Sequence, residues 1–305
     1  IYYPPKLNLE QTSSEITANY KASIINGKRI ADITGGFGVD SYYFSNVFKE
    51  VHHFELNKKL SEIANYNFSV LTKKNVHCFN ENGINKVLNE NFDVVYADPS
   101  RRHDNKGKVF YLKDCEPNIP LHLKNILKQT KKLLIKTSPM LDISIGLKEL
   151  QFVSEIHIVA INNEVKELLW LIKSDFTGQP KVKTININKD CKDVFEFNIN
   201  DQLNTEYSTP KKFLYEPNAA IMKSGAFNLI SNRYKIQKLH KHTHLFTNDI
   251  LINFPGRKFI INEVVTYQKK NFKKIANIDK ANISIRNFPE SVAVLRKKLK
   301  IKDGG

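Results

Sequence analysis

The stretch SEIHIVAINNEVKELLWLIK, residues 154–173, decides the fold because it holds two apolar strands with only a short turn between them. The residues NNEV (162–165) that separate the strands are typical of a tight turn. Two strands this close in sequence cannot be joined by a crossover helix, so they must pair antiparallel as a hairpin. We expect this hairpin at the edge of a larger sheet.

The chain before the hairpin alternates short apolar runs with longer amphipathic segments. Lys58–Leu71 is one such segment, and its apolar residues recur at helical spacing. This alternation predicts βαβ units and therefore an α/β fold with a doubly wound, mostly parallel sheet. The five expected strands are KRIADI (28–33), EVHHFEL (50–56), NVHCF (75–79), DVVYAD (93–98) and KLLIKT (132–137).

A parallel sheet that ends in an antiparallel hairpin differs from a dinucleotide-binding Rossmann sheet, which would continue with another crossover. Residues 174–210 are polar and rich in Asn, and we expect a strand or two and a linker there. A second domain is expected from Lys211 onward. We therefore predict two domains, residues 1–210 and residues 211–305, with the second domain cut short at its C-terminus.

A glycine-rich stretch, ADITGGFGVD (31–40), follows the first expected strand and opens a helix. Gly35, Gly36 and Gly38 allow a tight turn and let backbone N–H groups approach a ligand closely. Glu55 ends the second strand about 20 residues later, where a carboxylate can accept both hydroxyls of a ribose. We expect a nucleoside-containing ligand here.

Two acids flank the glycine loop, Asp32 just before the turn and Asp40 just after it. They would repel the pyrophosphate of a dinucleotide but suit S-adenosylmethionine, which carries an ammonium and a sulfonium and no phosphate. S-adenosylmethionine is therefore the expected cofactor, and a nicotinamide enzyme is the least favoured reading. The alternative is an ordinary strand-to-helix turn with Asp40 as a solvated acid. Asn80 or Glu81, after the third strand, can bind the adenine amino group or belong to an ordinary turn.

The fourth expected strand ends in DPSRR (98–102), an acid, a proline, a serine and two arginines. Ligands of a doubly wound sheet bind outside the carboxyl ends of the strands at the topological switch, which the first and fourth strands flank. DPSRR should therefore face the glycine loop across the reactive end of the cofactor. Arg101 can stack on a base or bind a phosphate or carboxylate. Alternatively, one arginine pairs with Asp98 and the other, Arg102, is solvated.

These motifs and the terminal hairpin resemble those of the class I S-adenosylmethionine-dependent methyltransferases. DITGGFGVD resembles motif I, FEL the acid after motif I, and DPSRR motif IV, which in amino-methylating members is Asp or Asn, Pro, Pro and an aromatic residue that stacks on the base. Asp98 and Pro99 match the first two positions, whereas Ser100 and Arg101 depart from the pattern, so the aromatic platform is missing. The resemblance implies in-line methyl transfer with Asp98, Pro99 and Arg101 as catalytic residues.

Motifs along nearly the whole chain carry a closer resemblance. They are PPKLNLEQTSSE (4–15), DPSRR (98–102), KTSPMLD (136–142), NNEVKELLW (162–170), YEPNAAIMKSG (215–225) and HLFTN (244–248). Together they resemble a bacterial family of class I methyltransferases with a ferredoxin-like, THUMP-like C-terminal region. This resemblance implies a small α+β domain after the methyltransferase domain. It also implies RNA as a partner, because THUMP-type modules bind RNA in tRNA-modifying enzymes.

The net charge of +16 is unevenly distributed along the chain. Residues 1–210 hold 27 basic and 25 acidic residues, whereas residues 211–305 hold 20 basic and 6 acidic residues. A codon bias would spread lysines evenly, so this step indicates a polyanion-binding module attached to a near-neutral domain. Cations of this module can meet phosphates while exposed aromatic residues stack on bases, although we expect most of its aromatic residues in the core. The expected substrate contacts are Ser100, Arg102, Lys136, Lys211, Lys212, Arg233 and Lys235.

Two further features of the second domain have plain structural explanations. His240, His242 and His244 can lie on one side of a strand, but no acid or Cys accompanies them, so no metal is expected. Glu216 precedes an apolar helix and is expected to cap and orient it.

The cysteines and the apolar runs indicate in which cellular compartment the protein works. Cys78, Cys115 and Cys191 lie far apart with no CxxC spacing, which argues against a disulfide framework and a zinc site. The longest apolar runs are much shorter than the ~20 residues of a membrane-spanning helix, and no signal-peptide pattern opens the chain. We expect a cytoplasmic protein without a membrane partner.

The leading hypothesis is a methyltransferase that acts on RNA, tRNA or rRNA, with a base nitrogen as methyl acceptor. A second hypothesis keeps the enzyme and assigns it a small anionic metabolite or a protein side chain, bound by Arg101 and Arg102. A third is an RNA-binding protein with a catalytically silent methyltransferase domain, against which the intact glycine loop and Glu55 count. The oligomeric state stays open.

Overall fold

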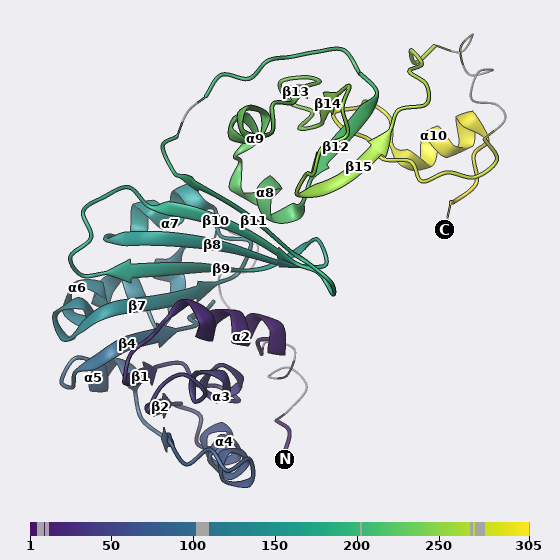
Figure 1. Cartoon of the computed structure of the whole chain (residues 1–305). Coiled ribbons are helices and arrows are strands. Elements are labelled where there is room, and N and C mark those ends of the chain that lie inside the picture. Colours follow the sequence, from purple (N-terminus) through teal and green to yellow (C-terminus); the bar gives the residue numbers. More distant parts are fainter. Residues whose placement is uncertain are drawn as a thin grey trace. The chain divides into compact units, whose positions relative to one another are not determined.

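The computed structural model describes residues 1–4, 9, 12–101, 110–201, 203–268, 271 and 278–304, with Arg101 described by its backbone alone. The chain divides into two compact units, Ile1–Asn200 and Asp201–Gly305, and both are drawn in Figure 1. The domain boundary expected near Lys211 falls within the second unit and stays a prediction.

A nine-stranded sheet forms the centre of the first unit, with strand order β11-β10-β8-β9-β7-β4-β1-β2-β3 (Figure 1). Five of its strands run parallel, which confirms the predicted doubly wound sheet. These strands are β1 (Arg29–Asp32), β2 (Glu50–Phe54), β3 (Val76–Phe79), β4 (Phe92–Ala97) and β7 (Thr130–Thr137).

The predicted hairpin is formed by β8 (Val153–Ile161) and β9 (Glu164–Lys173), and β9 lies between β7 and β8, antiparallel to both. Its turn residues Asn162 and Asn163 have φ values of 49° and 64°, as a type I′ turn requires. Asn tolerates this left-handed conformation better than most residues.

The prediction that this hairpin forms the sheet edge was wrong. The strand β10 (Lys181–Ile187) pairs parallel with β8, and β11 (Lys192–Asn198) pairs antiparallel with β10 and forms the outer edge. The expected strands of the Asn-rich stretch therefore extend the same sheet. Val182, Ile185 and Phe195 of these strands are buried, whereas most of the other positions hold polar residues, which hide the strand pattern.

Helices lie on both faces of this sheet (Figure 1). Buried apolar side chains of the central strands, such as Ile30, Val94 and Leu134, form the core with Phe44 and Phe68 from the helices. The helices are α2 (Glu15–Ile24), α3 (Val39–Phe44), α4 (Lys58–Val70), α5 (Gly83–Val87), α6 (Ile119–Gln129) and α7 (Ile143–Glu149). Within the described ranges, no helix is both long and apolar enough to cross a bilayer.

The second unit is a small α+β domain, as predicted. Its four strands form an antiparallel sheet in the order β13-β14-β12-β15. The elements are β12 (Phe213–Pro217), α8 (Ala219–Ser224), α9 (Phe227–Tyr234), β13 (Gln237–Lys238), β14 (Phe246–Asn248), β15 (Gly256–Ile260) and α10 (Val292–Leu299).

Two smaller expectations for the second unit were wrong. Residues 241–243 form a turn rather than a strand, and His244 stacks on Phe227 with ring centroids 3.6 Å apart. Asn218, not Glu216, caps α8, because its side chain accepts the Ile221 N–H at 3.1 Å. No group of His, Cys, Asp and Glu side chains in the described part of the chain is arranged to hold a metal ion.

Candidate active site

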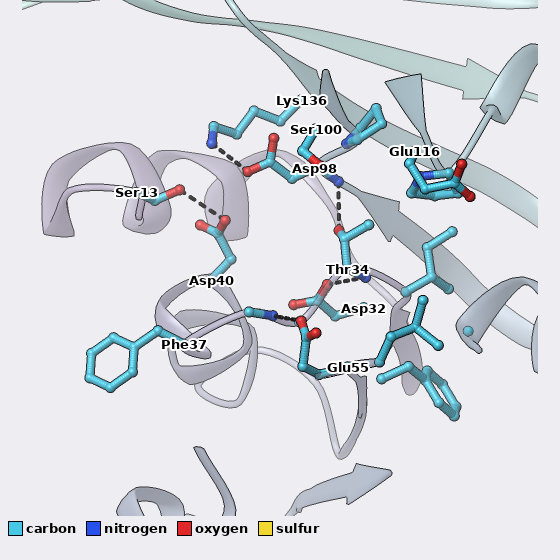
Figure 2. Close-up of a pocket in the computed structure, with 18 of the residues that line it drawn as sticks. Ser13, Asp32, Thr34, Phe37, Asp40, Glu55, Asp98, Ser100, Glu116 and Lys136 are labelled. Atoms are coloured by element: carbon cyan, nitrogen blue, oxygen red, sulfur yellow. Dashed lines mark hydrogen bonds and ion pairs between the residues drawn. The ribbon is translucent and has the colours of Figure 1, made fainter. Parts of the chain in front are cut away.

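A pocket of about 1040 Å³ opens at the carboxyl ends of β1, β2, β4 and β7 (Figure 2). Carboxyl ends of neighbouring parallel strands meet at one edge of the sheet, so residues far apart in sequence come together here. The predicted site residues in its lining are Asp32, Gly35, Gly36, Gly38, Asp40, Glu55, Asp98, Pro99, Ser100 and Lys136.

The glycine loop has a backbone that other residues would not adopt easily. Gly36 and Gly38 have φ values of 55° and 89°, and Gly38 is the N-cap of α3. At Gly35, a Cβ atom would lie 2.3 Å from Nε2 of His53, a fully buried ring beneath the loop. The glycines therefore give the loop its shape as well as an open approach to the pocket.

Glu55 lies at the end of β2 and points toward the glycine loop (Figure 2). Its carboxylate accepts the Gly36 N–H at 2.9 Å and the Asn57 N–H at 2.7 Å. A carboxylate has about four lone-pair sites, so these two bonds leave capacity for the hydroxyls of a ribose. Leu56 and Ile84 add apolar surface to the same lining, so this end of the pocket fits an adenosine moiety.

Asp32 braces the loop from the end of β1. It is buried, and its carboxylate accepts the Ser41 hydroxyl at 2.7 Å and the Thr34 N–H at 3.2 Å. Burial raises the pKa of Asp32 to about 7 against the opposing hydrogen bond from Ser41, and the charge of Asp40 adds to the rise. Asp32 therefore titrates near neutral pH.

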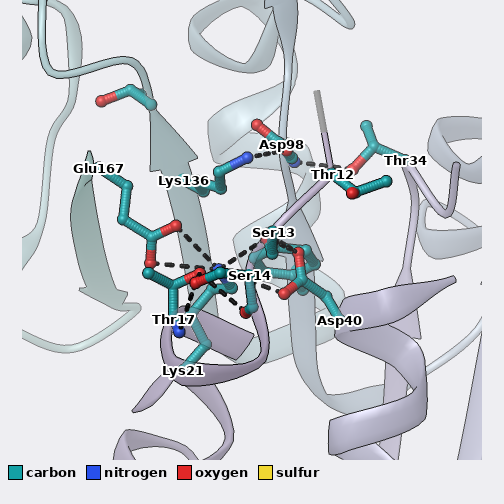
Figure 3. A network of polar contacts seen from close by, with 12 residues as sticks. Thr12, Ser13, Ser14, Thr17, Lys21, Thr34, Asp40, Asp98, Lys136 and Glu167 are labelled. Carbon is teal, nitrogen blue, oxygen red and sulfur yellow. Dashed lines mark hydrogen bonds and ion pairs between the residues drawn. The ribbon is translucent and has the colours of Figure 1, made fainter. Parts of the chain in front are cut away.

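Asp40 is not the solvated acid of the alternative reading. Its carboxylate accepts the Tyr96 hydroxyl at 2.7 Å and the Ser13 hydroxyl at 2.9 Å. The Lys21 ammonium lies 3.2 Å from its other oxygen. Lys21 has no exposed side-chain surface and also binds the carboxylate of Glu167 at 2.9 Å (Figure 3). We call Lys21, Asp40 and Glu167 the buried charge cluster.

Sequence reasoning missed Lys21 and Glu167, although a signal was present. Glu167 is an acid within an apolar strand, and a charged group at such a position requires a buried partner. Its partner Lys21 comes from α2, far away in the chain, and only the fold brings the two together.

Asp98 forms an ion pair at the carboxyl end of β4. Its backbone N–H donates to the Thr34 hydroxyl at 2.7 Å, and the Lys136 ammonium donates to its carboxylate at 2.5 Å. Burial raises the pKa of Asp98, and the charge of Lys136 opposes that rise. Burial lowers the pKa of Lys136, but Asp98 and Asp40 outweigh this effect, so the pKa lies above its ordinary value.

The other residues of DPSRR have different positions. Pro99 is buried, and Ser100 is exposed and begins β5 (Ser100–Arg101), which pairs with β6 (Cys115–Glu116). The Arg101 side chain and Arg102 lie outside the described part of the structure, so their expected roles stay predictions.

Asn80 and Glu81 do not line the pocket. The Asn80 amide donates to the backbone carbonyls of Glu55 and Leu56 at 2.8 and 2.9 Å, and Glu81 pairs with Lys86 at 3.2 Å. The turn residues that follow, Asn82 and Gly83, line the pocket in their place.

The predicted substrate contacts of the second unit lie near its sheet. Lys211 pairs with Asp249 at 3.3 Å, and the Lys212 ammonium lies over the Phe213 ring. Arg233 and Lys235 are exposed at the end of α9. Five aromatic residues lie among the basic residues of this part of the sequence: Tyr215 and Phe246 are fully buried, Phe227 and Tyr234 are partly exposed, and Phe259 is exposed.

Comparisons with known proteins cover both units. A ferredoxin-like domain family matches residues 213–255, and a THUMP domain-like family matches residues 256–305. The crystal structure of a candidate methyltransferase from Porphyromonas gingivalis W83 matches with a TM-score of 0.90 and 31% identity, over 100% of this chain and 78% of that chain. No curated protein matches.

Two other solved structures are similar to about half of this chain. An rRNA methylase from Streptococcus thermophilus matches with a TM-score of 0.37 and 16% identity, over 52% of this chain and 94% of that chain. A candidate methyltransferase from Streptococcus mutans in complex with SAH matches with a TM-score of 0.38 and 17% identity, over 52% and 96%.

Proposed function

This chain belongs to the family of the Porphyromonas gingivalis protein, within the class I S-adenosylmethionine-dependent methyltransferases, and we propose that it methylates RNA. The observation that carries the proposal is the single pocket that joins Glu55 and the glycine loop at one end to Asp98 at the other. When bound there, S-adenosylmethionine supplies a methyl carbon already activated by its sulfonium.

The residues of the pocket divide the work between binding and orientation. We propose that Glu55 accepts the ribose hydroxyls of the cofactor and that the loop of Gly36 and Gly38 shapes the space beside them. Asp98 holds the acceptor group by a hydrogen bond, with Pro99 fixing the backbone behind it. In-line methyl transfer requires alignment more than acid–base chemistry, so such orientation is the main contribution of the chain.

The second domain supports RNA as the substrate. Residues 211–305 hold 20 basic and 6 acidic residues, and Lys212, Arg233 and Lys235 are exposed there. Cations distributed in this way bind the phosphates of a nucleic acid. The match to a THUMP domain-like family supports the same substrate class, tRNA or rRNA. The cytoplasmic location expected from the cysteines stays a prediction.

The methyl acceptor expected from motif IV alone is a nitrogen of a nucleobase, an amino group whose N–H donates a hydrogen bond to Asp98. The ion pair between Asp98 and Lys136, which the sequence did not show, bears on that choice.

Transfer of a tritiated methyl group from S-adenosylmethionine to total RNA of host cells that lack the gene tests the proposal. We expect label in RNA that is removed by ribonuclease, and its loss in Asp98→Ala. RNA binding should weaken steeply as salt increases. Label confined to small metabolites or to protein, or no label at all, would refute RNA as the substrate.

A further inference from the structure

The end of the pocket where we place the methyl acceptor, which we call the acceptor end, presents a hydrogen-bond donor, Lys136, beside a hydrogen-bond acceptor, Asp98. Lys136 and Asp98 lie at the carboxyl ends of the neighbouring strands β7 and β4, both line the pocket, and Nζ and Oδ2 are 2.5 Å apart. Their side chains keep 15% and 32% of their surface exposed, so both can reach a ligand. In the described part of the chain, Oδ1 of Asp98 has no partner, and an ammonium has two further N–H donors.

This arrangement restricts the kind of atom that can be methylated. The atom that accepts the methyl group must keep one lone pair free to attack the methyl carbon while it is hydrogen-bonded to Asp98 and Lys136. A hydroxyl oxygen has one proton and two lone pairs, so it can donate to Asp98, accept from Lys136 and still attack. A base nitrogen that attacks has a single lone pair, so a hydrogen bond from Lys136 would occupy the electrons that must form the new bond.

The charges favour the same atom. A nitrogen acceptor gains positive charge as the new bond forms, and the Lys136 ammonium beside it opposes that gain. A hydroxyl oxygen that loses its proton gains negative charge, which the same ammonium stabilises. A carboxylate acceptor would bring no proton for Asp98 and would be repelled by it.

We infer that the methyl acceptor is a hydroxyl oxygen, in RNA the ribose 2′-hydroxyl, bound jointly by Asp98 and Lys136. This inference rests on the proposed RNA methyltransferase function and names its acceptor. A lone pair of the oxygen forms the C–O bond as the methyl carbon leaves sulfur with neither electron of the C–S bond. The O–H bond breaks, and its proton passes to the carboxylate of Asp98.

The acids of the buried charge cluster affect the protonation of Lys136. These acids are Asp40 and Glu167, and the negative charges of both favour the ammonium form of Lys136. Lys21 binds both of these acids and so fixes them on α3 and β9 (Figure 3).

The position of the methyl group in the RNA product tests the inference. Tritium-labelled product RNA is hydrolysed in alkali, which cleaves only beside a free 2′-hydroxyl. Methylation of the 2′-oxygen therefore leaves labelled dinucleotides, whereas methylation of a base leaves labelled mononucleotides. We expect the label in dinucleotides. Label in mononucleotides would overturn the hydroxyl acceptor and leave the proposed RNA methyltransferase intact, whereas the absence of label from all RNA would refute both.

Variants of Lys136 test the role of its charge. Lys136→Met should lower methyl transfer by about 100-fold or more, with S-adenosylmethionine affinity by calorimetry within about threefold of the wild type. Lys136→Arg, which keeps the charge, should recover part of the activity. Lys131→Met makes the same change at an exposed position of β7 and should alter neither quantity. Equal activity of Lys136→Met and the wild type would overturn the role of Lys136.

Discussion

The two ends of the pocket differ in the groups that form them. The proposed cofactor end depends on the backbone: Gly36 and Gly38 have left-handed conformations, and one carboxylate, Glu55, accepts backbone N–H groups. The acceptor end depends on charged side chains from several elements, with the pair of Asp98 and Lys136 in front of the buried charge cluster. A nucleoside is recognised by shape and a few hydrogen bonds, whereas choosing the atom to be methylated requires control of charge.

The largest effect is expected from the buried charge cluster. Lys21→Met leaves Asp40 and Glu167 without their common cation, so we expect a loss of about 3–5 kcal/mol in the free energy of unfolding, measured in urea. Adding Glu167→Gln removes one of the two uncompensated charges and should recover part of the loss. A loss below about 1 kcal/mol in the single variant would contradict the view that the acceptor end depends on buried charge.

Asp32 should make the cofactor end sensitive to pH. Its pKa in the folded chain, about 7, lies above its ordinary value, so the folded state binds more protons than the unfolded state between about pH 4 and 7. Stability from this group is therefore present below its ordinary pKa and is lost as pH rises through 7. Relative to the wild type, Asp32→Asn should gain on the order of 2–4 kcal/mol from pH 4 to pH 8 in urea unfolding. Parallel stability profiles of the two proteins would contradict this assignment.

A smaller effect is expected from the close contact beneath the glycine loop. Gly35→Ala forces a methyl group against the His53 ring and should cost about 1–3 kcal/mol in unfolding free energy, with weaker S-adenosylmethionine binding. His53→Ala in the same chain makes room for the methyl group, so the two changes should be less destructive together than their sum. Simple additivity would show that the contact does not shape the loop.

The smallest effects are expected in the second domain, outside the pocket. Lys212→Ala and Arg233→Ala should each weaken RNA binding by roughly 1 kcal/mol and reduce its salt dependence, since each removes about one phosphate contact. The affinity for S-adenosylmethionine, measured by calorimetry, should not change. A loss of cofactor affinity in either variant would contradict the assignment of these cations to RNA binding alone.

The residues of the proposed cofactor end could be named from the sequence, because the information for them is local. The loop of Gly35 to Gly38 and Glu55 come from consecutive strand ends, and their spacing reflects one βαβ unit. The acceptor end was predictable only in part. Asp98 and Lys136 could each be named, but their pairing spans 38 residues and depends on β4 and β7 being neighbours.

The same difference explains what was missed elsewhere. Lys21 and Glu167 lie 146 residues apart, so no local pattern shows that they meet. The edge of the sheet was predicted at the wrong place because the many polar residues of 174–210 hid the strands β10 and β11, which pair beyond the hairpin. Asn80 and Glu81 were chosen by their place at a strand end, which does not say which turn residue faces the pocket.

Titration calorimetry of the purified chain with S-adenosylmethionine tests the central claim, a methyl-donor site organised around Glu55. The wild type should bind one equivalent with micromolar affinity, and Glu55→Ala should weaken binding by about 100-fold, since it loses charged hydrogen bonds to two hydroxyls. Glu62 is an exposed acid on α4, so Glu62→Ala should bind S-adenosylmethionine as tightly as the wild type. No binding by the wild type, or equal binding by Glu55→Ala, would contradict the site.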